Sequence, residues 1–347
     1  MQSIGYDSQV VKPAAIRSDD YRELLPNFLS KSNWSSFSES IEIEIVPTQH
    51  GKLYCIISAC LHIVSAILCR ALSDMSVAQV LFFRSFLLAS SFIAYQYYTN
   101  RISHIIHNIS FRMLFVSFSY SMCNYLFYTA VRELCMFELV TIFSAAVIFN
   151  CFFSYIFYSE PYSNIEKLLG VVSVIGTVLI VRPHHFFENY DDNSHRTGMQ
   201  LPHYSAGLLA VLSTALYSVT QVTLKKLKSD LDPLSVFLSM NGLGVVWYAL
   251  YFLVFGFDGT ITALGALGIV GMAISSGFTA FFAIKGLKNE EPRMASLLSY
   301  TQLGFAVIAD VIFYGDFPPG LSVVGAILVV GSCLYLIKRN MESKVEY

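Results

Sequence analysis

Apolar stretches of about 20 residues recur along most of this chain, and short polar stretches separate them. An α-helix rises about 1.5 Å per residue, so about 20 apolar residues cross the hydrocarbon core of a bilayer. Membrane-spanning helices are predicted at 53–73, 78–98, 113–131, 136–158, 165–182, 204–224, 234–255, 263–285, 294–314 and 320–337. The pattern therefore predicts an all-α integral membrane protein with ten transmembrane helices.

The composition agrees with a chain that lies mostly in lipid. Of the 347 residues, 55% are hydrophobic and 13% are charged, whereas a soluble domain carries about 25% charged residues. The net charge of −2 offers no basic surface for nucleic acid, so no nucleic-acid partner is expected. The seven cysteines lie at or within apolar runs and form no CxxC pair, so neither a metal site nor a cofactor is expected.

Three polar segments frame the spans. Residues 1–50 are polar and rich in serine, which predicts a disordered tail, and residues 184–206 form a polar linker between two halves. Residues 340–347 form a short second tail. Lys and Arg near the span ends are more numerous on the side that holds both tails, which predicts cytoplasmic N- and C-termini. The choice between the plasma membrane and an endomembrane stays open.

The two halves of the chain repeat one another. The sequence IFYSE begins at Ile156 and IFYGD begins 156 residues later, at Ile312. At the same offset Gly51 aligns with Gly207, so the predicted repeats cover 51–183 and 207–339, with five spans each. An odd number of spans makes the second copy enter the membrane from the opposite side, which predicts an inverted-topology repeat and an alternating-access mechanism.

These motifs carry a resemblance to a known family. Span 2 holds an arginine in VLFFRSFLLAS, span 4 ends in IFYSE before LLGVVSVIGTVLIVRP, and the second copy ends in IFYGD before VVGAILVVGSCLYLIKR. In this order the motifs resemble tandem EamA-like domains of the drug/metabolite transporter superfamily, similar to carriers of solute carrier family 35. The resemblance implies secondary transport of a small organic solute across the lipid bilayer.

Polar side chains inside the spans are the candidates for a solute pathway. Such groups are costly in lipid and are expected to face other helices or a cavity. The candidates are His62, Asn124, Tyr128, Gln221, Asn241, Tyr300 and Gln302. Hydrogen bonds between packed helices are the alternative role for the amides and hydroxyls. For His62, a neutral imidazole is the alternative to a proton-coupling group.

Two charges, Arg84 and Asp310, lie well inside spans 2 and 9. Counting residues from the span ends places both roughly 6–9 Å below the outer edge of the membrane, so an ion pair that acts as an outer gate is predicted. The alternative is that each side chain reaches separately to the interface. Lys285 ends span 8 on the cytoplasmic side, where it either meets an anionic solute or extends to the interface.

Other classes of function find less support. The spans contain no HExxH, GxSxG or similar catalytic motif, so an enzyme is not expected. A transport-inactive membrane regulator or receptor with the same fold remains the alternative. Spans 5 and 10 carry glycine pairs six residues apart and almost no polar residues, which indicates lipid contact or a homodimer surface.

Overall fold

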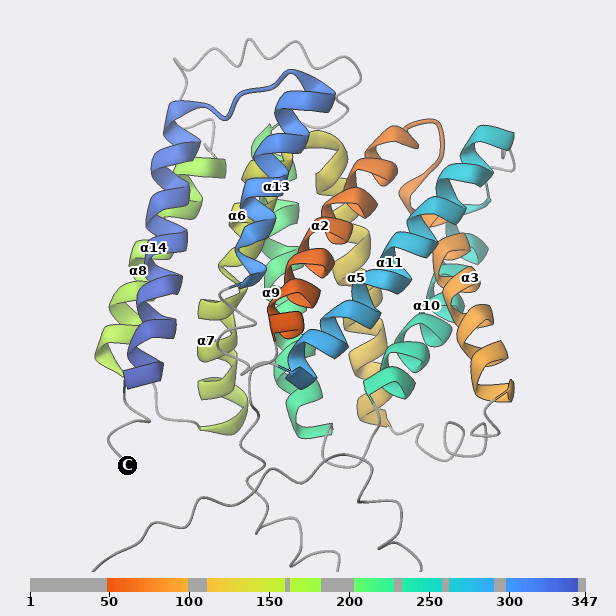
Figure 1. Ribbon diagram of the computed structural model, residues 1–347, viewed down its shortest axis with the longest axis horizontal. Helices are drawn as coiled ribbons and strands as arrows, with labels where there is room; N and C mark the ends of the chain where they lie inside the picture. Colours follow the sequence, from red (N-terminus) through yellow and green to blue (C-terminus); the bar gives the residue numbers. More distant parts are fainter. Residues whose placement is uncertain are drawn as a thin grey trace, which may run out of the picture. The chain divides into compact units, whose positions relative to one another are not determined.

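The computed structural model describes residues 49–98, 111–159, 163–181, 203–227, 233–257, 262–289 and 298–342. Within these ranges the regular secondary structure is helical, as predicted (Figure 1). Apart from their edges, the predicted tails and the linker at 184–206 lie outside the described residues.

The helices follow the predicted spans closely. They are α2 (Gln49–Ala71), α3 (Val77–Tyr98), α5 (Phe111–Glu133), α6 (Met136–Ser144), α7 (Ala146–Tyr158), α8 (Asn164–Val181), α9 (His203–Leu227), α10 (Pro233–Phe255), α11 (Ala263–Asn289), α13 (Thr301–Ala309), the π-helix η2 (Asp310–Tyr314) and α14 (Gly320–Glu342). In the described part of the chain, seven helical segments are long and apolar enough to cross a membrane, and two shorter apolar helices, Ser239–Phe255 and Thr301–Tyr314, accompany them. These features identify a multi-pass integral membrane protein.

The fourth span of each half departs from a straight α-helix. The predicted span 136–158 is divided at Ala145, whose backbone N–H turns to the Ile142 carbonyl at 3.1 Å. Ser144 Oγ donates to the Val140 carbonyl, a local bond that often bends helices. In the second half, the corresponding irregularity lies at Tyr300, directly before α13, where the Leu303 backbone N–H donates to the Tyr300 carbonyl at 3.0 Å. The π-helix η2 follows α13 directly, and its repeat equivalent in α7 is regular α-helix. Because neither span contains proline, these irregularities arise without the usual helix breaker.

The repeated motif IFY-small-acid ends a helix in both halves. Ser159 follows α7 with φ 53°, and Gly315 follows η2 with φ 66°. Both residues therefore lie in the left-handed region, where a chain leaves a helix readily if the residue there is small. The two positions are 156 residues apart, so the repeat seen in the sequence recurs in the backbone conformation.

Helix packing links the two halves throughout. From the first half, α2 packs against α11, α3 against α10, α5 against α9 and α8 against α14. Under the repeat, α2 is equivalent to α9, α3 to α10, α5 to α11 and α8 to α14. The α2–α11 pair is therefore equivalent to the α9–α5 pair, and the α3–α10 and α8–α14 pairs are each equivalent to themselves. Residues 46–347 accordingly form a single compact unit in which each half supplies the partners of the other.

Glycines bring α8 and α14 into backbone contact. A Cβ atom built on Gly176 would lie 2.7 Å from the Gly325 carbonyl oxygen, and one on Gly325 would lie 2.6 Å from the Gly176 carbonyl oxygen. Any larger residue at either position would force the two helices apart. Gly176 and Gly325 therefore serve packing within the chain, whereas a Cβ atom added to Gly331 would meet nothing within 4 Å.

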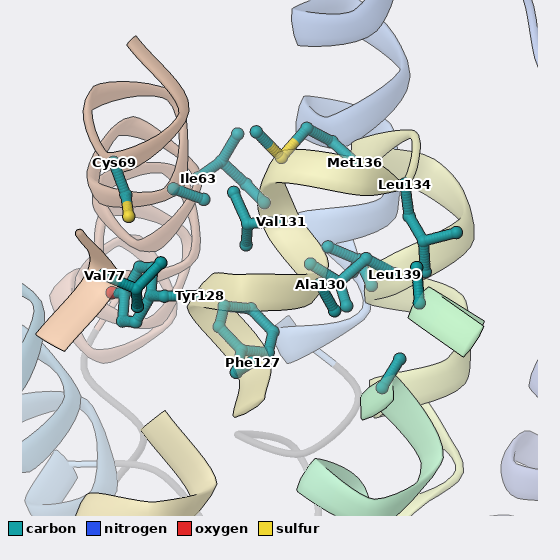
Figure 2. Close-up of a cluster of buried hydrophobic side chains, with 14 of the residues drawn as sticks. Ile63, Cys69, Val77, Phe127, Tyr128, Ala130, Val131, Leu134, Met136 and Leu139 are labelled. Atoms are coloured by element: carbon teal, nitrogen blue, oxygen red, sulfur yellow. The ribbon is translucent and has the colours of Figure 1, made fainter. Parts of the chain in front are cut away.

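The main apolar cluster consists mostly of first-half side chains, joined by second-half residues such as Tyr248, Met272 and Ala306. Figure 2 shows Ile63 and Cys69 of α2, Val77 of α3, and Met136 and Leu139 of α6. Side chains from the end of α5, among them Phe127 and Val131, lie between them, and Leu134, which follows α5, lies beside Leu139 (Figure 2). Leu134 and Met136 are fully buried, so this cluster fills the space between α2, α5 and α6.

Candidate functional site

A cavity of about 500 Å³ lies between the two halves. Helices α2, α3, α5 and α6 contribute lining residues from the first half, and α9, α10, α11 and α13 contribute from the second. The lining includes Cys55 near the start of α2, Leu224 near the end of α9 and Ile284 near the end of α11. The cavity therefore extends toward the end of the bundle where α2 begins, which we name the open end.

Arg84 lies in the wall of this cavity and is 4% exposed. Its Nη1 donates to the Tyr128 hydroxyl at 3.2 Å, and its Nη2 donates to Asn124 Oδ1 at 3.5 Å. The Tyr128 hydroxyl donates in turn to Ser65 Oγ at 3.5 Å, and Ser65 Oγ lies 2.8 Å from Ser276 Oγ. A chain of polar groups thus runs from α3 through α5 and α2 to α11, and it fixes the guanidinium in the wall.

His62 and Gln302 also line the cavity, and their side chains lie against one another. The imidazole of His62 stacks on the Phe127 ring with 5.6 Å between the ring centroids. Its Nδ1 is buried without a hydrogen-bond partner among the described residues. Because α2 belongs to the first half and α13 to the second, this contact joins the halves at the cavity wall.

Of the seven predicted pathway residues, five line the cavity: His62, Asn124, Tyr128, Gln221 and Gln302. Asn241 and Tyr300 do not. The Asn241 amide donates to the Phe237 carbonyl of its own helix at 2.8 Å. Tyr300 packs with Ile148 of α7 and Cys333 of α14. Sequence spacing alone could not show which of these polar side chains face the cavity.

Lys285 lies outside the cavity lining. Its Nζ is 4.6 Å from the centre of the Phe281 ring and 5.7 Å from the centre of the Tyr54 ring. The side chain is exposed, and both contacts are cation–π contacts with rings of α11 and α2. These contacts hold the Lys285 side chain against the rings of two helices, and both predicted roles, contact with an anionic solute or extension to the interface, stay predictions.

The opposite end of the bundle, where α2 ends and α6 begins, is closed by charged side chains and is named the closed end. Asp310 is 1% exposed and accepts hydrogen bonds from the backbone N–H groups of Met136 at 3.0 Å and Phe137 at 2.8 Å. Its carboxylate therefore caps the N-terminus of α6, where a negative charge is favoured. Arg70 Nη1 lies 4.0 Å from Asp310 Oδ1.

Two arginines complete the closed end. Arg70 lies over the Tyr314 ring, 3.9 Å from its centre. Arg132 donates to the carbonyl oxygens of Met75 at 2.7 Å and Leu72 at 2.8 Å. These bonds tie the end of α5 to the connection between α2 and α3, so several elements of the first half are held together here.

The predicted ion pair between Arg84 and Asp310 is not formed in this structure. Among the described residues, the ion-pair contact of Asp310 is with Arg70, and the hydrogen bonds of Arg84 go to Tyr128 and Asn124. The reason lies in the packing: α3 packs against α10 and α11, whereas α13 packs against α2 and α6. Similar depth in the membrane therefore did not place the two charges together.

The sequence analysis missed a buried acid, Glu138, which is 1% exposed in the first turn of α6. Ser322 of α14 donates its hydroxyl hydrogen to Glu138 Oε1 at 2.6 Å. An acid inside the predicted span 136–158 was the available signal, but Glu138 lies only two residues from the span end, where a charge can reach the interface. Arg70 was missed for the same reason, since it lies in the last turn of α2.

Comparisons with known proteins agree on the class of protein. A model of the EamA-like transporter family matches residues 49–182 and again residues 205–338. The chain is 26% identical over 225 residues to solute carrier family 35 member G1 of Homo sapiens, a match that covers 60% of this chain and 56% of that protein. It is 22% identical over 222 residues to a probable transport protein of Saccharomyces cerevisiae, covering 56% of this chain and 60% of the yeast protein.

These matches span little more than half the length of the curated relatives. A solved crystal structure shares the fold more completely. It superposes with a TM-score of 0.54 at 14% identity, covering 86% of this chain and 98% of the other.

Proposed function

Because this chain belongs to the EamA-like transporter family, we propose that it is a secondary-active transporter of a small organic solute that works by alternating access. The observation that carries the proposal is the cavity between the two halves, which extends to the open end while charged side chains seal the closed end. A cavity of about 500 Å³ suits a small solute, since ligand pockets commonly measure about 300–1,000 Å³.

The proposal includes ten transmembrane helices in two inverted five-helix repeats. The exchange of packing partners supports it, because α2 with α11 and α9 with α5 are equivalent pairs under the repeat. In such an arrangement, swapping the conformations of the two halves converts a cavity open at one end into a cavity open at the other. With both termini in the cytoplasm, the open end faces the cytoplasm and the closed end faces outward.

Within this cycle the solute contacts the cavity residues, namely Asn124, Gln221, Gln302 and His62, whose amides and imidazole supply neutral hydrogen-bonding groups. Asp310 and Arg70 act as the outer gate in place of the pair predicted from the sequence. Opening outward then requires Asp310 to leave the N-terminus of α6. Asn241, Tyr300 and Lys285 have no solute contact in this scheme, since they lie outside the cavity lining.

The alternative, a transport-inactive regulator or receptor, is not favoured by any feature of the described residues. A homodimer would have to use the outer faces of α8 and α14, where Val171, Val174, Val324 and Ile327 are exposed. The same faces suit lipid equally well.

Solute counterflow in proteoliposomes tests the transport proposal. Full-length protein is reconstituted with a panel of unlabelled metabolites inside, and entry of the labelled counterpart is followed. We expect one chemical class to exchange, and we expect Gln302→Ala to slow that exchange by about tenfold, the effect of one well-placed hydrogen bond. Thr177→Ala on α8, which bonds only to its own helix, is the matched control.

Ligand-dependent thermal stabilisation separates the two functions. A ligand at 100 times its Kd stabilises the folded protein by about 2.7 kcal/mol. A solute that stabilises the protein in this way but never exchanges across the liposome membrane would contradict transport and would support the regulator.

A further inference from the structure

The charge of the cavity wall identifies the class of solute more narrowly, provided that the cavity is the solute site proposed above. Among the described residues that line it, Arg84 is the single Lys or Arg, and none is Asp or Glu. Arg84 is 4% exposed and makes no ion pair with a described carboxylate. A buried guanidinium without a counter-charge is unfavourable, because its desolvation is not compensated by an ion pair. A bound anion would supply that compensation.

The Arg84 guanidinium also has N–H donors that bond to no described residue. A guanidinium has five N–H donors, and the two hydrogen bonds seen here go to neutral acceptors, Tyr128 and Asn124. Arg84 Nε is buried and has no hydrogen-bond partner among the described residues. Asn124 is itself oriented, because its Nδ2 donates to the Tyr120 carbonyl at 2.8 Å. The side chain is thus preorganised to receive an anionic group.

In the described wall of the cavity, the repeat supplies one cation and not two. The position equivalent to Arg84, 156 residues later, is Met240, and both residues line the cavity. A cation is therefore present on one of two equivalent positions. A solute with a second anionic group, or with an ammonium group, would find no opposite charge among the described lining residues.

The rest of the wall suits an apolar or aromatic body. Rings of Tyr120, Phe127, Phe143, Tyr217 and Phe237 line the cavity beside the neutral amides of Gln221 and Gln302. We propose that the solute is an organic monoanion whose anionic group pairs with Arg84 and whose apolar or aromatic body lies against these rings.

A matched ligand series tests this in the wild-type protein. The full-length chain in detergent is titrated with 3-phenylpropionate, 3-phenylpropanamide, 3-phenylpropylamine and benzylmalonate, which share one aromatic body and carry one negative, no, one positive and two negative charges. Thermal stabilisation gives the relative Kd values. We expect the monoanion to bind about tenfold or more tightly than the other three, as a charge-assisted contact requires. Equal or tighter binding of the amide, or no binding of the monoanion, overturns the proposal.

Phenylethanesulfonate distinguishes the kind of anion. If it binds as tightly as 3-phenylpropionate, the site recognises any group with a single negative charge. If it binds at least about tenfold more weakly, the site reads a carboxylate. Both outcomes support the monoanion.

Variants then assign the preference to Arg84. Arg84→Gln should abolish the discrimination between acid and amide, and Arg84→Lys should retain it with weaker binding of the acid. Lys167→Gln on α8, an exposed cation outside the cavity lining, should change neither affinity. Discrimination that survives in Arg84→Gln would overturn the assignment. If Arg84→Gln does not fold, Arg84→Lys still tests the role of Arg84, and the wild-type ligand series still tests the monoanion proposal.

Failure of this inference is separable from failure of transport. If a neutral or cationic solute exchanges in the counterflow assay and the monoanion does not bind, transport stands and the monoanion is wrong. If the monoanion binds in the expected order but no solute exchanges, the anion site stands and the transport proposal is wrong.

Discussion

At the closed end of the bundle, charged side chains bind backbone groups or an opposite charge of the protein. In the cavity wall, the charged side chain of Arg84 bonds only to neutral side chains. Asp310 accepts two backbone hydrogen bonds and contacts Arg70, and Arg132 donates to two carbonyl oxygens. Arg84, equally buried, has only neutral acceptors. The difference is consistent with the two proposals above, in which the charges at the closed end form the outer gate and Arg84 binds an anionic solute.

The comparison also exposes an asymmetry between the halves. Position 310 is Asp, but the equivalent position in the first half, 156 residues earlier, is Ser154. A carboxylate at this position is therefore present in one copy of the repeat alone. In the alternating-access cycle proposed above, the two conformations are then not equivalent, because one of them contains the Asp310 cap and the other does not.

Replacing Asp310 should have the largest effect on the contrast between the closed end and the cavity. Asp310→Ala leaves the N–H groups of Met136 and Phe137 without their acceptor and Arg70 without its carboxylate, so we expect a loss of about 3 kcal/mol of stability. Thermal unfolding in detergent measures the loss. Opening of the closed end should also raise maleimide labelling of the buried Cys135, read by peptide mass spectrometry.

Ser154→Ala is the matched control for Asp310→Ala, because it changes the equivalent position in the first half. We expect it to leave Cys135 labelling unchanged. An Asp310→Ala protein that unfolds at the wild-type temperature and keeps Cys135 protected would remove Asp310 from the gate.

The next largest effect is expected where α8 and α14 touch, away from both ends. Gly176→Ala places a Cβ atom 2.7 Å from the Gly325 carbonyl oxygen, which is backbone and cannot rotate away. We expect a loss of about 2 kcal/mol from this overpacking, measured by thermal unfolding. Gly331, the second glycine of the pair in the other copy, has nothing within 4 Å of an added Cβ. Gly331→Ala should therefore be neutral or stabilising, and equal losses in both variants would contradict the contact.

A smaller effect should come from the hydroxyl that binds Glu138 at the closed end. Ser322→Ala removes a 2.6 Å hydrogen bond to a buried carboxylate, and we expect a loss of about 1.5 kcal/mol. Ser332→Ala on the same helix removes only bonds to carbonyl oxygens of α14 itself. The difference between the two unfolding temperatures isolates the contribution of the Glu138 contact, and identical temperatures would show that it contributes nothing.

The smallest effect concerns the end of α7. Ser159 has φ 53°, a conformation that glycine adopts without strain, as Gly315 does at the equivalent position. Ser159→Gly should stabilise the protein by about 0.5 kcal/mol, and Gly315→Ser should destabilise it by a similar amount. Thermal unfolding of both variants checks the sign, and a change in the same direction for both would contradict a shared role.

The helices were predictable from sequence because a long apolar run has few alternatives. Predicted spans 78–98 and 165–182 differ from α3 and α8 by a single residue at each end at most. Bends were not predictable. Beside the break at Ala145, the Ser144 carbonyl accepts a hydrogen bond from Cys333 Sγ of the distant helix α14 at 3.5 Å, a contact that the local sequence does not indicate.

The site was predictable in part. Polarity at membrane depth singled out Asn124 and Gln302 as pathway candidates and Arg84 as a gate candidate, and all three line the cavity. It could not separate them from Asn241, whose amide bonds to its own helix, because helix rotation is set by packing. The depth of Asp310 in the membrane likewise did not predict its contact with Arg70. That contact depends on which helices are neighbours and on the position of the N-terminus of α6.

The contact between Gly176 and Gly325 has a consequence for the assembly of the chain. It joins backbone to backbone across the two copies of the repeat, so recognition there depends on neither half being covalently linked to the other. A chain cut between Val181 and His203 and expressed as two fragments should accordingly reassemble in the membrane, and Gly176→Val should abolish that complementation.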